Sequence, residues 1–121
     1  MNINLDMIRT PTLLLNETQS KRNIQRMADK AAVRNIRFRP HFKTHQSVQI
    51  GEWFRDAGVT RITVSSVSMA EFFAEHGWED ILIAFPVNLR EIDQIRSLAG
   101  RIHLGLLVDM EESIKEIQKT I

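Results

Sequence analysis

One helix-start signature recurs along the chain at a nearly constant spacing. A capping residue is followed three positions later by a glutamate at Ser68, Asn88 and Asp109, and each pair comes just after a short apolar run. The intervals of 20 and 21 residues are the length of one strand plus one helix. This repeat predicts β/α units, and a β/α alternation implies a parallel sheet with right-handed crossovers.

Four strands and five helices follow from this pattern. The strands are expected at 36–42, 61–65, 80–85 and 102–108. The helices are expected at 17–34, 46–57, 68–76, 89–98 and 110–120, with Asn16 as a further N-cap and with Gly58, Gly77 and Gly100 at the C-terminal ends. The fold class is therefore α/β. Four such units fit either a small open α/β sheet or about half of a β/α barrel.

The length and composition limit the alternatives. A chain of 121 residues is one small domain, because a complete β/α barrel needs about 250 residues. The hydrophobic content of 43% suits a packed core, and no apolar run approaches the roughly 18 residues of a membrane span. Cysteine is absent, which favours a cytoplasmic protein. The last expected helix runs into Ile121, so we expect the chain to be part of a longer fold.

The net charge of +1 hides an uneven distribution. Residues 1–60 contain ten Lys/Arg and five Asp/Glu, whereas residues 61–121 contain six and ten. The basic first half suits a small anionic ligand or an acidic partner, but two solvated surfaces of opposite charge explain it equally well. Because no Lys/Arg run reaches 5–8 residues, we expect no nucleic-acid partner.

The segment 37–45, RFRPHFKTH, has the most unusual pattern. On a strand, one face would be apolar and suited to packing under helices: Phe38, Pro40 and Phe42. The other face would be polar: Arg37, Arg39, His41 and Lys43. Lys43 ends the strand, where β/α proteins place their sites. A lysine held among cations and partly desolvated has a lowered pKa, which frees its amine to attack carbonyl groups. An edge strand with these side chains in water is the alternative.

The octapeptide RPHFKTHQ resembles the RPHxKTHK signature of the D-threonine aldolase and D-serine dehydratase group, which are alanine-racemase-like fold-type III pyridoxal-phosphate enzymes. The resemblance runs from TPTLLLNETQSKRNIQRMA to LGLLVD, over residues 11–110. It implies that residues 1–121 form a single partial domain, the N-terminal portion of a cofactor-binding TIM-type barrel. Two positions differ from the family's pattern: Gln46 replaces the motif's last basic residue, and Phe85 stands where many relatives have Asn.

The resemblance also implies roles for the residues of the motif. Lys43 would bind pyridoxal 5′-phosphate covalently through its amine. His41 and His45 would hydrogen-bond the cofactor or relay a proton, unless they are polar structural groups. Arg39 would support the cofactor site electrostatically or form a buried ion pair, and Thr44 would bind the phosphate or cap the next helix. A divalent metal is possible in a longer enzyme, with no ligands in this chain.

The implied function is that of a pyridoxal-phosphate enzyme acting on D-amino acids. The reaction would be retro-aldol cleavage of β-hydroxy-D-amino acids or dehydrative deamination of D-serine. The alternatives are an amino-acid racemase, a non-catalytic truncated domain that self-associates, and a doubly wound binding domain without a cofactor. We expect the isolated chain to be inactive. We also expect a homodimer, because four parallel strands leave open edges that proteins usually cover.

Overall fold

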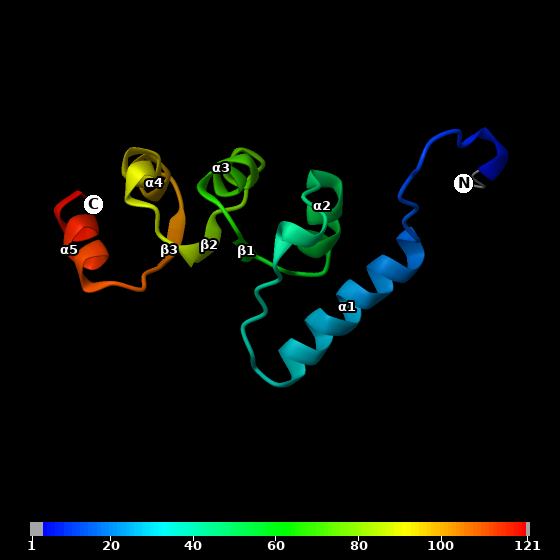
Figure 1. Ribbon diagram of the computed structural model, residues 1–121. Coiled ribbons are helices and arrows are strands. Elements are labelled where there is room, and N and C mark those ends of the chain that lie inside the picture. Colours follow the sequence, from blue (N-terminus) through cyan, green and yellow to red (C-terminus); the bar gives the residue numbers. More distant parts are fainter. Residues whose placement is uncertain (1–3, 121) are drawn as a thin grey trace.

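The structure, a computed structural model, describes residues 4–120 (Figure 1). Three parallel strands form one sheet in the order β1-β2-β3: β1 (Ile62–Val64), β2 (Asp80–Pro86) and β3 (His103–Leu107). Five α-helices accompany them: α1 (Glu17–Val33), α2 (Val48–Asp56), α3 (Val67–Glu75), α4 (Ile92–Ala99) and α5 (Glu111–Thr120). Three short 3₁₀ helices complete the elements: η1 (Leu5–Met7), η2 (Phe42–Thr44) and η3 (Leu89–Glu91).

The strand order identifies the type of α/β fold. Each strand pairs with the next strand in the sequence, and α2, α3 and α4 lie along one face of the sheet (Figure 1). A doubly wound sheet would reverse its strand order and carry helices on both faces. A sheet that is wound in one direction, with helices on one face only, has the arrangement of a barrel sector. The predicted α/β class with a parallel sheet is confirmed.

The core lies between the sheet and these helices. Ile62, Val64, Ile81 and Ile83 of β1 and β2 are buried, and they alternate with residues of the opposite, open face. The helices and loops add further buried side chains, among them Phe42, Phe73, Trp78, Ile95 and Leu98. The open face carries the paired row His41, Thr63, Leu82 and Gly105. Within residues 4–120, the sheet therefore has one face in the core and one face without a helical cover.

The prediction of a strand at 36–42 was wrong in part. The segment is extended, but it joins the sheet at a single bridge between His41 and Thr63, where the Thr63 N–H donates to the Pro40 carbonyl at 2.8 Å. Pro40 has no N–H to extend the ladder, and the chain turns into η2 at Phe42. The expected alternation is nevertheless present, since Phe42 is buried beneath the helices and His41 pairs with Thr63.

The helix ends follow most of the expected signals. Asn16 caps α1 by accepting the Gln19 N–H at 2.9 Å, as predicted. Ser68 does not cap α3, because α3 begins earlier and Ser66, which has extended backbone, accepts the Met69 N–H. Asn88 caps η3, which leads into α4.

The predicted glycine positions are confirmed. Gly58 and Gly77 follow α2 and α3 with φ of +82° and +81°, a region that favours glycine, and Gly100 is the C-cap of α4.

Helix α1 projects from the rest of the described chain (Figure 1). Ile24 is its one buried residue, and its contact with α2 includes the Lys21 ammonium 5.1 Å from the centre of the Trp53 ring. None of the helices within residues 4–120 combines the length and the apolar character that crossing a bilayer requires.

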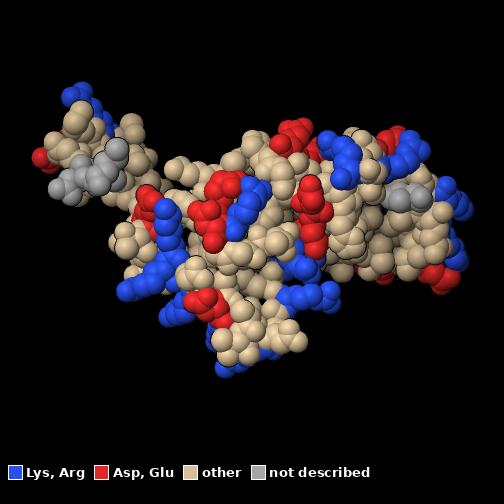
Figure 2. All heavy atoms as spheres, turned by 180° about the vertical axis from the view of Figure 1, so that it is seen from behind, with Lys and Arg blue, Asp and Glu red and all other residues tan. Residues whose placement is uncertain are grey.

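Charged side chains of both signs are mixed on the surface that Figure 2 shows. Several ion pairs form within single helices, among them Lys21–Glu17, Arg55–Glu52, Arg96–Asp93 and Lys115–Glu111. On this face, the uneven charge of the sequence halves does not produce one continuous basic surface.

Candidate functional site

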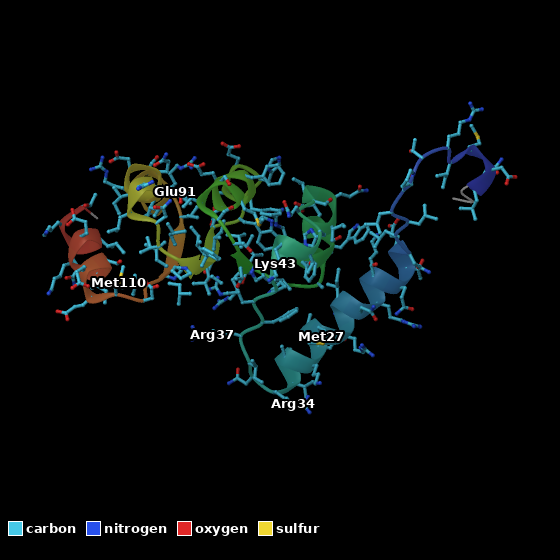
Figure 3. All side chains as sticks on the ribbon, viewed as in Figure 1. Met27, Arg34, Arg37, Lys43, Glu91 and Met110 are labelled. Atoms are coloured by element: carbon cyan, nitrogen blue, oxygen red, sulfur yellow. The ribbon has the colours of Figure 1, made fainter. Side chains whose placement is uncertain are left out.

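The RPHFKTH segment connects α1 to α2, and it ends at the same edge of the sheet as the carboxyl ends of the three parallel strands. Lys43 lies in η2 and its side chain is exposed (Figure 3). The predicted partial desolvation of Lys43 is therefore not found in the described chain. The cause is local, because the 3₁₀ turn begins at Phe42, whose ring is buried, and turns the next residue outward.

His41 is held next to Lys43 on the open face of the sheet. Its Nδ1 accepts a hydrogen bond from the Lys43 backbone N–H at 3.3 Å, so the proton of the neutral ring lies on Nε2. Desolvation lowers the pKa of His41, and the positive charge of Lys43 lowers it further. At neutral pH, His41 is therefore an uncharged ring whose Nε2–H can donate a hydrogen bond.

His45 lies on the other side of the motif, among the aromatic rings beneath the helices. Its ring centre is 4.5 Å from that of Phe42 and 5.8 Å from that of Phe54. Its Nδ1 accepts the Ser47 N–H at 3.1 Å, and its buried Nε2 has no hydrogen-bond partner within residues 4–120. Burial lowers the pKa of His45, and the hydrogen bond with Ser47 opposes this effect. The two histidines thus flank Lys43 in the sequence but lie on opposite faces.

Thr44 does not cap the helix that follows it, so one of its two expected roles is wrong. Its hydroxyl donates to the His41 carbonyl at 3.3 Å, and the N-cap of α2 is Ser47, whose Oγ accepts the Ile50 N–H. The helix begins later because Gln46 adopts a left-handed backbone with φ of +47°. The sequence contains the signal for this cap, since Ser47 stands directly before the apolar positions Val48 and Ile50.

Arg39 forms the partly buried ion pair that sequence reasoning left as one of two alternatives. Its guanidinium donates to the Ile62 carbonyl at 3.0 Å, to the Asp80 carbonyl at 3.3 Å and to the Asp80 carboxylate at 2.6 Å. Arg61 approaches the same carboxylate at 3.6 Å. Because Arg39 precedes His41 by two residues, these contacts lie toward the amino end of the sheet. Sequence reasoning missed Asp80, because only the fold brings it to the motif.

A hollow of about 400 Å³ lies at the carboxyl ends of β1 and β2. The loops that lead into α3 and α4 provide its polar lining: Ser65, Ser66, Asn88 and Glu91. Phe85, at one of the two positions where the sequence departs from the family pattern, also lines it and is exposed. Lys43 does not line this hollow. In the described chain, the hollow and Lys43 thus lie at the same edge of the sheet but are not in contact.

No protein-family model matches the chain. The D-threo-3-hydroxyaspartate dehydratase of Delftia sp. (strain HT23) is 37% identical to it over 101 residues, which are 83% of this chain and 27% of that protein. The D-serine dehydratase of Dictyostelium discoideum is 28% identical over 122 residues, covering 96% of this chain and 31% of the relative.

Solved structures give the same assignment. The D-threonine aldolase from Filomicrobium marinum matches with a TM-score of 0.88 and 31% identity, over 96% of this chain and 32% of that chain. An alanine racemase-like protein from Idiomarina loihiensis matches with a TM-score of 0.82 and 26% identity, over 93% of this chain and 31% of that chain. The chain spans less than a third of the length of these relatives, and over that length it is similar to the D-threonine aldolase and D-serine dehydratase group of alanine-racemase-like proteins.

Proposed function

We propose that this chain carries the cofactor lysine, Lys43, of a pyridoxal-phosphate enzyme that acts on D-amino acids. The observation that carries the proposal is the position of Lys43: exposed, within RPHFKTH, at the carboxyl edge of a parallel sheet. The reaction would be retro-aldol cleavage of a β-hydroxy-D-amino acid or dehydrative deamination of D-serine. The names of the relatives, which are dehydratases and an aldolase of D-amino acids, support this choice over racemisation.

The residues around Lys43 fit the cofactor. The aldehyde of pyridoxal phosphate reacts with a primary amine, and Lys43 offers an exposed one. The oxygen on the cofactor ring accepts a hydrogen bond, and the Nε2–H of His41 is a donor for it. The hydroxyl of Thr44 is exposed beside Lys43 and is a candidate for the phosphate. When bound, the cofactor supplies an electron sink that stabilises negative charge at the α-carbon of an amino acid. Lys43 then holds or returns the proton at that carbon.

The remaining motif residues would act as supports in this proposal. His45 packs against Phe42 and Phe54 and accepts the Ser47 N–H, so it anchors the turn that presents Lys43 to the start of α2. The buried Nε2 of His45 has no acceptor within residues 4–120, and this observation supports the alternative of a direct role in catalysis. Arg39 contacts the sheet rather than the edge at which Lys43 lies.

We further propose that residues 1–121 are one partial domain, the N-terminal portion of a β/α barrel, and that the chain forms a homodimer. The support is the sheet face and the edge of β3 that the described part of the chain leaves uncovered. Leu107 at the end of β3 is exposed, and so are Met110 in the loop that follows it and Ile114 in α5. The same feature favours the second candidate function, a non-catalytic domain that self-associates. The absence of cysteine supports the predicted cytoplasmic location.

Covalent labelling tests the proposed role of Lys43. The purified chain is incubated with pyridoxal 5′-phosphate, the adduct is reduced with borohydride, and peptide mapping locates the label. We expect Lys43 to take up more label than Lys21 or Lys30, two other lysines of the basic half. An equal distribution among the lysines, or preference for Lys21 or Lys30, would contradict the assignment. Lys43→Arg is the matched control, since it keeps the charge and removes the reactive amine.

A further inference from the structure

We propose that Asp80 is a positioning residue for Lys43: through Arg39, its carboxylate holds the motif segment in register against β1 and β2. The inference deepens the proposed function and rests on it, because the role of Asp80 matters to chemistry only if Lys43 carries the cofactor. Asp80 is the first residue of β2 and lies 37 positions after Lys43 in the sequence, so no local motif connects them.

The motif segment has few backbone bonds to the sheet. It pairs with β1 at one bridge, His41 with Thr63, and the hydrogen bond there runs from the Thr63 N–H to the Pro40 carbonyl. Pro40 offers no donor in return. Apart from the packing of Phe42 in the core, the backbone holds the segment at this one point, and a slip of one residue would exchange its two faces. Such a slip would move His41 toward the core and Phe42 out of it.

Arg39 supplies the contacts that the backbone lacks. Its guanidinium bonds the Ile62 carbonyl of β1, the Asp80 carbonyl of β2 and one oxygen of the Asp80 carboxylate. One side chain of the motif therefore reaches two strands. The planar guanidinium group fixes direction as well as distance, which a lysine at this position would not do.

Asp80 makes this arrangement possible. Arg39 and Arg61 approach its carboxylate from two sides, at 2.6 Å and 3.6 Å, and all three side chains are less than a third exposed. Without the negative charge, two guanidinium groups would face one another in a partly desolvated site, which is unfavourable. We therefore expect loss of the carboxylate to release Arg39, and with it the segment that places His41 and Lys43.

Hydrogen exchange at a single backbone amide tests the inference without any cofactor. The Thr63 N–H is protected by the Pro40 carbonyl, so it reports whether the motif segment is docked. In Asp80→Asn we expect this amide to exchange about tenfold faster, which corresponds to about 1.4 kcal/mol. The Ile81 and Ile83 amides in the middle strand should keep their protection. Unchanged exchange at Thr63 would overturn the inference.

Matched variants separate this local effect from a general loss of stability. Asp93→Asn makes the same substitution at an exposed ion pair with Arg96 on α4, and we expect no change at Thr63. Asp80→Glu keeps the charge and should restore part of the protection. If Asp80→Asn does not fold, Arg39→Lys replaces it, because it keeps the charge balance and removes the three-way contact. Protection at Thr63 equal to that of the unmodified chain in Arg39→Lys would then overturn the inference.

The labelling experiment distinguishes failure of this inference from failure of the proposed function. If Lys43 is not preferred in the unmodified chain, the proposed function fails, whatever the exchange result. If the label prefers Lys43 to the same extent in the unmodified chain and in Asp80→Asn, the assignment of Lys43 as the cofactor lysine is supported. The positioning role of Asp80 is then contradicted. We expect the preference for Lys43 in the unmodified chain, its reduction in Asp80→Asn, and its retention in Asp93→Asn.

Discussion

His41 Nδ1 accepts the backbone N–H of Lys43 at 3.3 Å, so the imidazole and the lysine are joined through the main chain of η2. The Lys43 ammonium also acts on the ring through space, as the second cause, after desolvation, of the lowered pKa of His41. The protonation state of His41 therefore depends on whether the Lys43 side chain carries a charge.

Removing that charge should be visible in the titration of His41. In Lys43→Met, we expect the pKa of His41 to rise toward its ordinary value of 6.5 but to stay below it, because desolvation remains. A histidine-resolved NMR titration measures the change. His45 is the internal control, since burial lowers its pKa without a contribution from Lys43, and its midpoint should not move. Equal shifts of the pKa values of His41 and His45 would contradict the assignment of the Lys43 charge as a cause.

The same lowered pKa values make the stability of the fold depend on pH. Both His41 and His45 have folded-state pKa values below 6.5, so the unfolded chain binds more protons as the pH falls past 6.5. Their contribution to the unfolding free energy is complete above that pH and is lost as the pH falls toward the folded values. We expect urea unfolding to give a lower free energy at about pH 5.5 than at about pH 7.5, within the range where histidine titrates. The difference should be smaller in His41→Gln.

Serine substitutions test which residues cap α2 and α3. Ser47→Ala and Ser66→Ala each remove an oxygen that accepts a backbone N–H, so each should lower the unfolding free energy by about 1 kcal/mol. Thr44→Ala and Ser68→Ala remove hydroxyls from neighbouring exposed positions and should change it by less than about 0.5 kcal/mol. Thermal or urea unfolding of the four variants gives the comparison. A larger loss in Thr44→Ala than in Ser47→Ala would reverse the assignment for α2.

The buried glycine of α2 allows Phe42 to pack beneath the helix. A Cβ at Gly51 would lie 3.3 Å from Phe42 Cε2, which is closer than an ordinary contact, and both Phe42 and the adjacent Trp78 are almost fully buried. Overpacking of this kind costs about 1–3 kcal/mol, which exceeds the gain of about 1 kcal/mol in helix propensity. We expect Gly51→Ala to lower the melting temperature. Gly100→Ala is the control, because a Cβ there meets only ordinary contacts at 3.6 Å and 3.7 Å.

The sequence predicts the elements of this fold better than it predicts the surroundings of the motif. The helix caps, apolar runs and glycine positions act within a few residues, so the three strands and five helices could be placed from them. The prediction of a strand at 36–42 was wrong in part because strand pairing depends on the neighbouring strand. Here the neighbour is β1, and Pro40 limits the pairing to one bridge. Alternation still assigned Phe42 to the core and His41 to the opposite face, because that property belongs to the strand alone.

The contacts of the RPHFKTH motif could not be predicted either, because they also depend on neighbouring parts of the fold. Lys43 was found from its local signature, but its exposure follows from the 3₁₀ turn that begins when Phe42 enters the core. The separation of His41 and His45 onto opposite faces also depends on this turn. Asp80 lies beside Arg39 because β2 pairs with β1, so residues far apart in the sequence decide that contact.

The free edge of β3 should direct self-association of the chain. Leu107 ends this strand and is 45% exposed, and Met110 and Ile114, which follow it in the sequence, are also exposed. An uncovered apolar edge is a site where another copy can pair, and a charge placed on it opposes pairing. We expect the purified chain to sediment as a dimer at micromolar concentration, and Leu107→Asp to shift it toward the monomer. Val33→Asp is the matched control: Val33 is 86% exposed but ends α1, which projects away from the sheet, so the dimer should persist (Figure 1). A monomer with a cooperative thermal transition in the unmodified chain would contradict the proposed assembly, because the uncovered sheet face would then be stable in water.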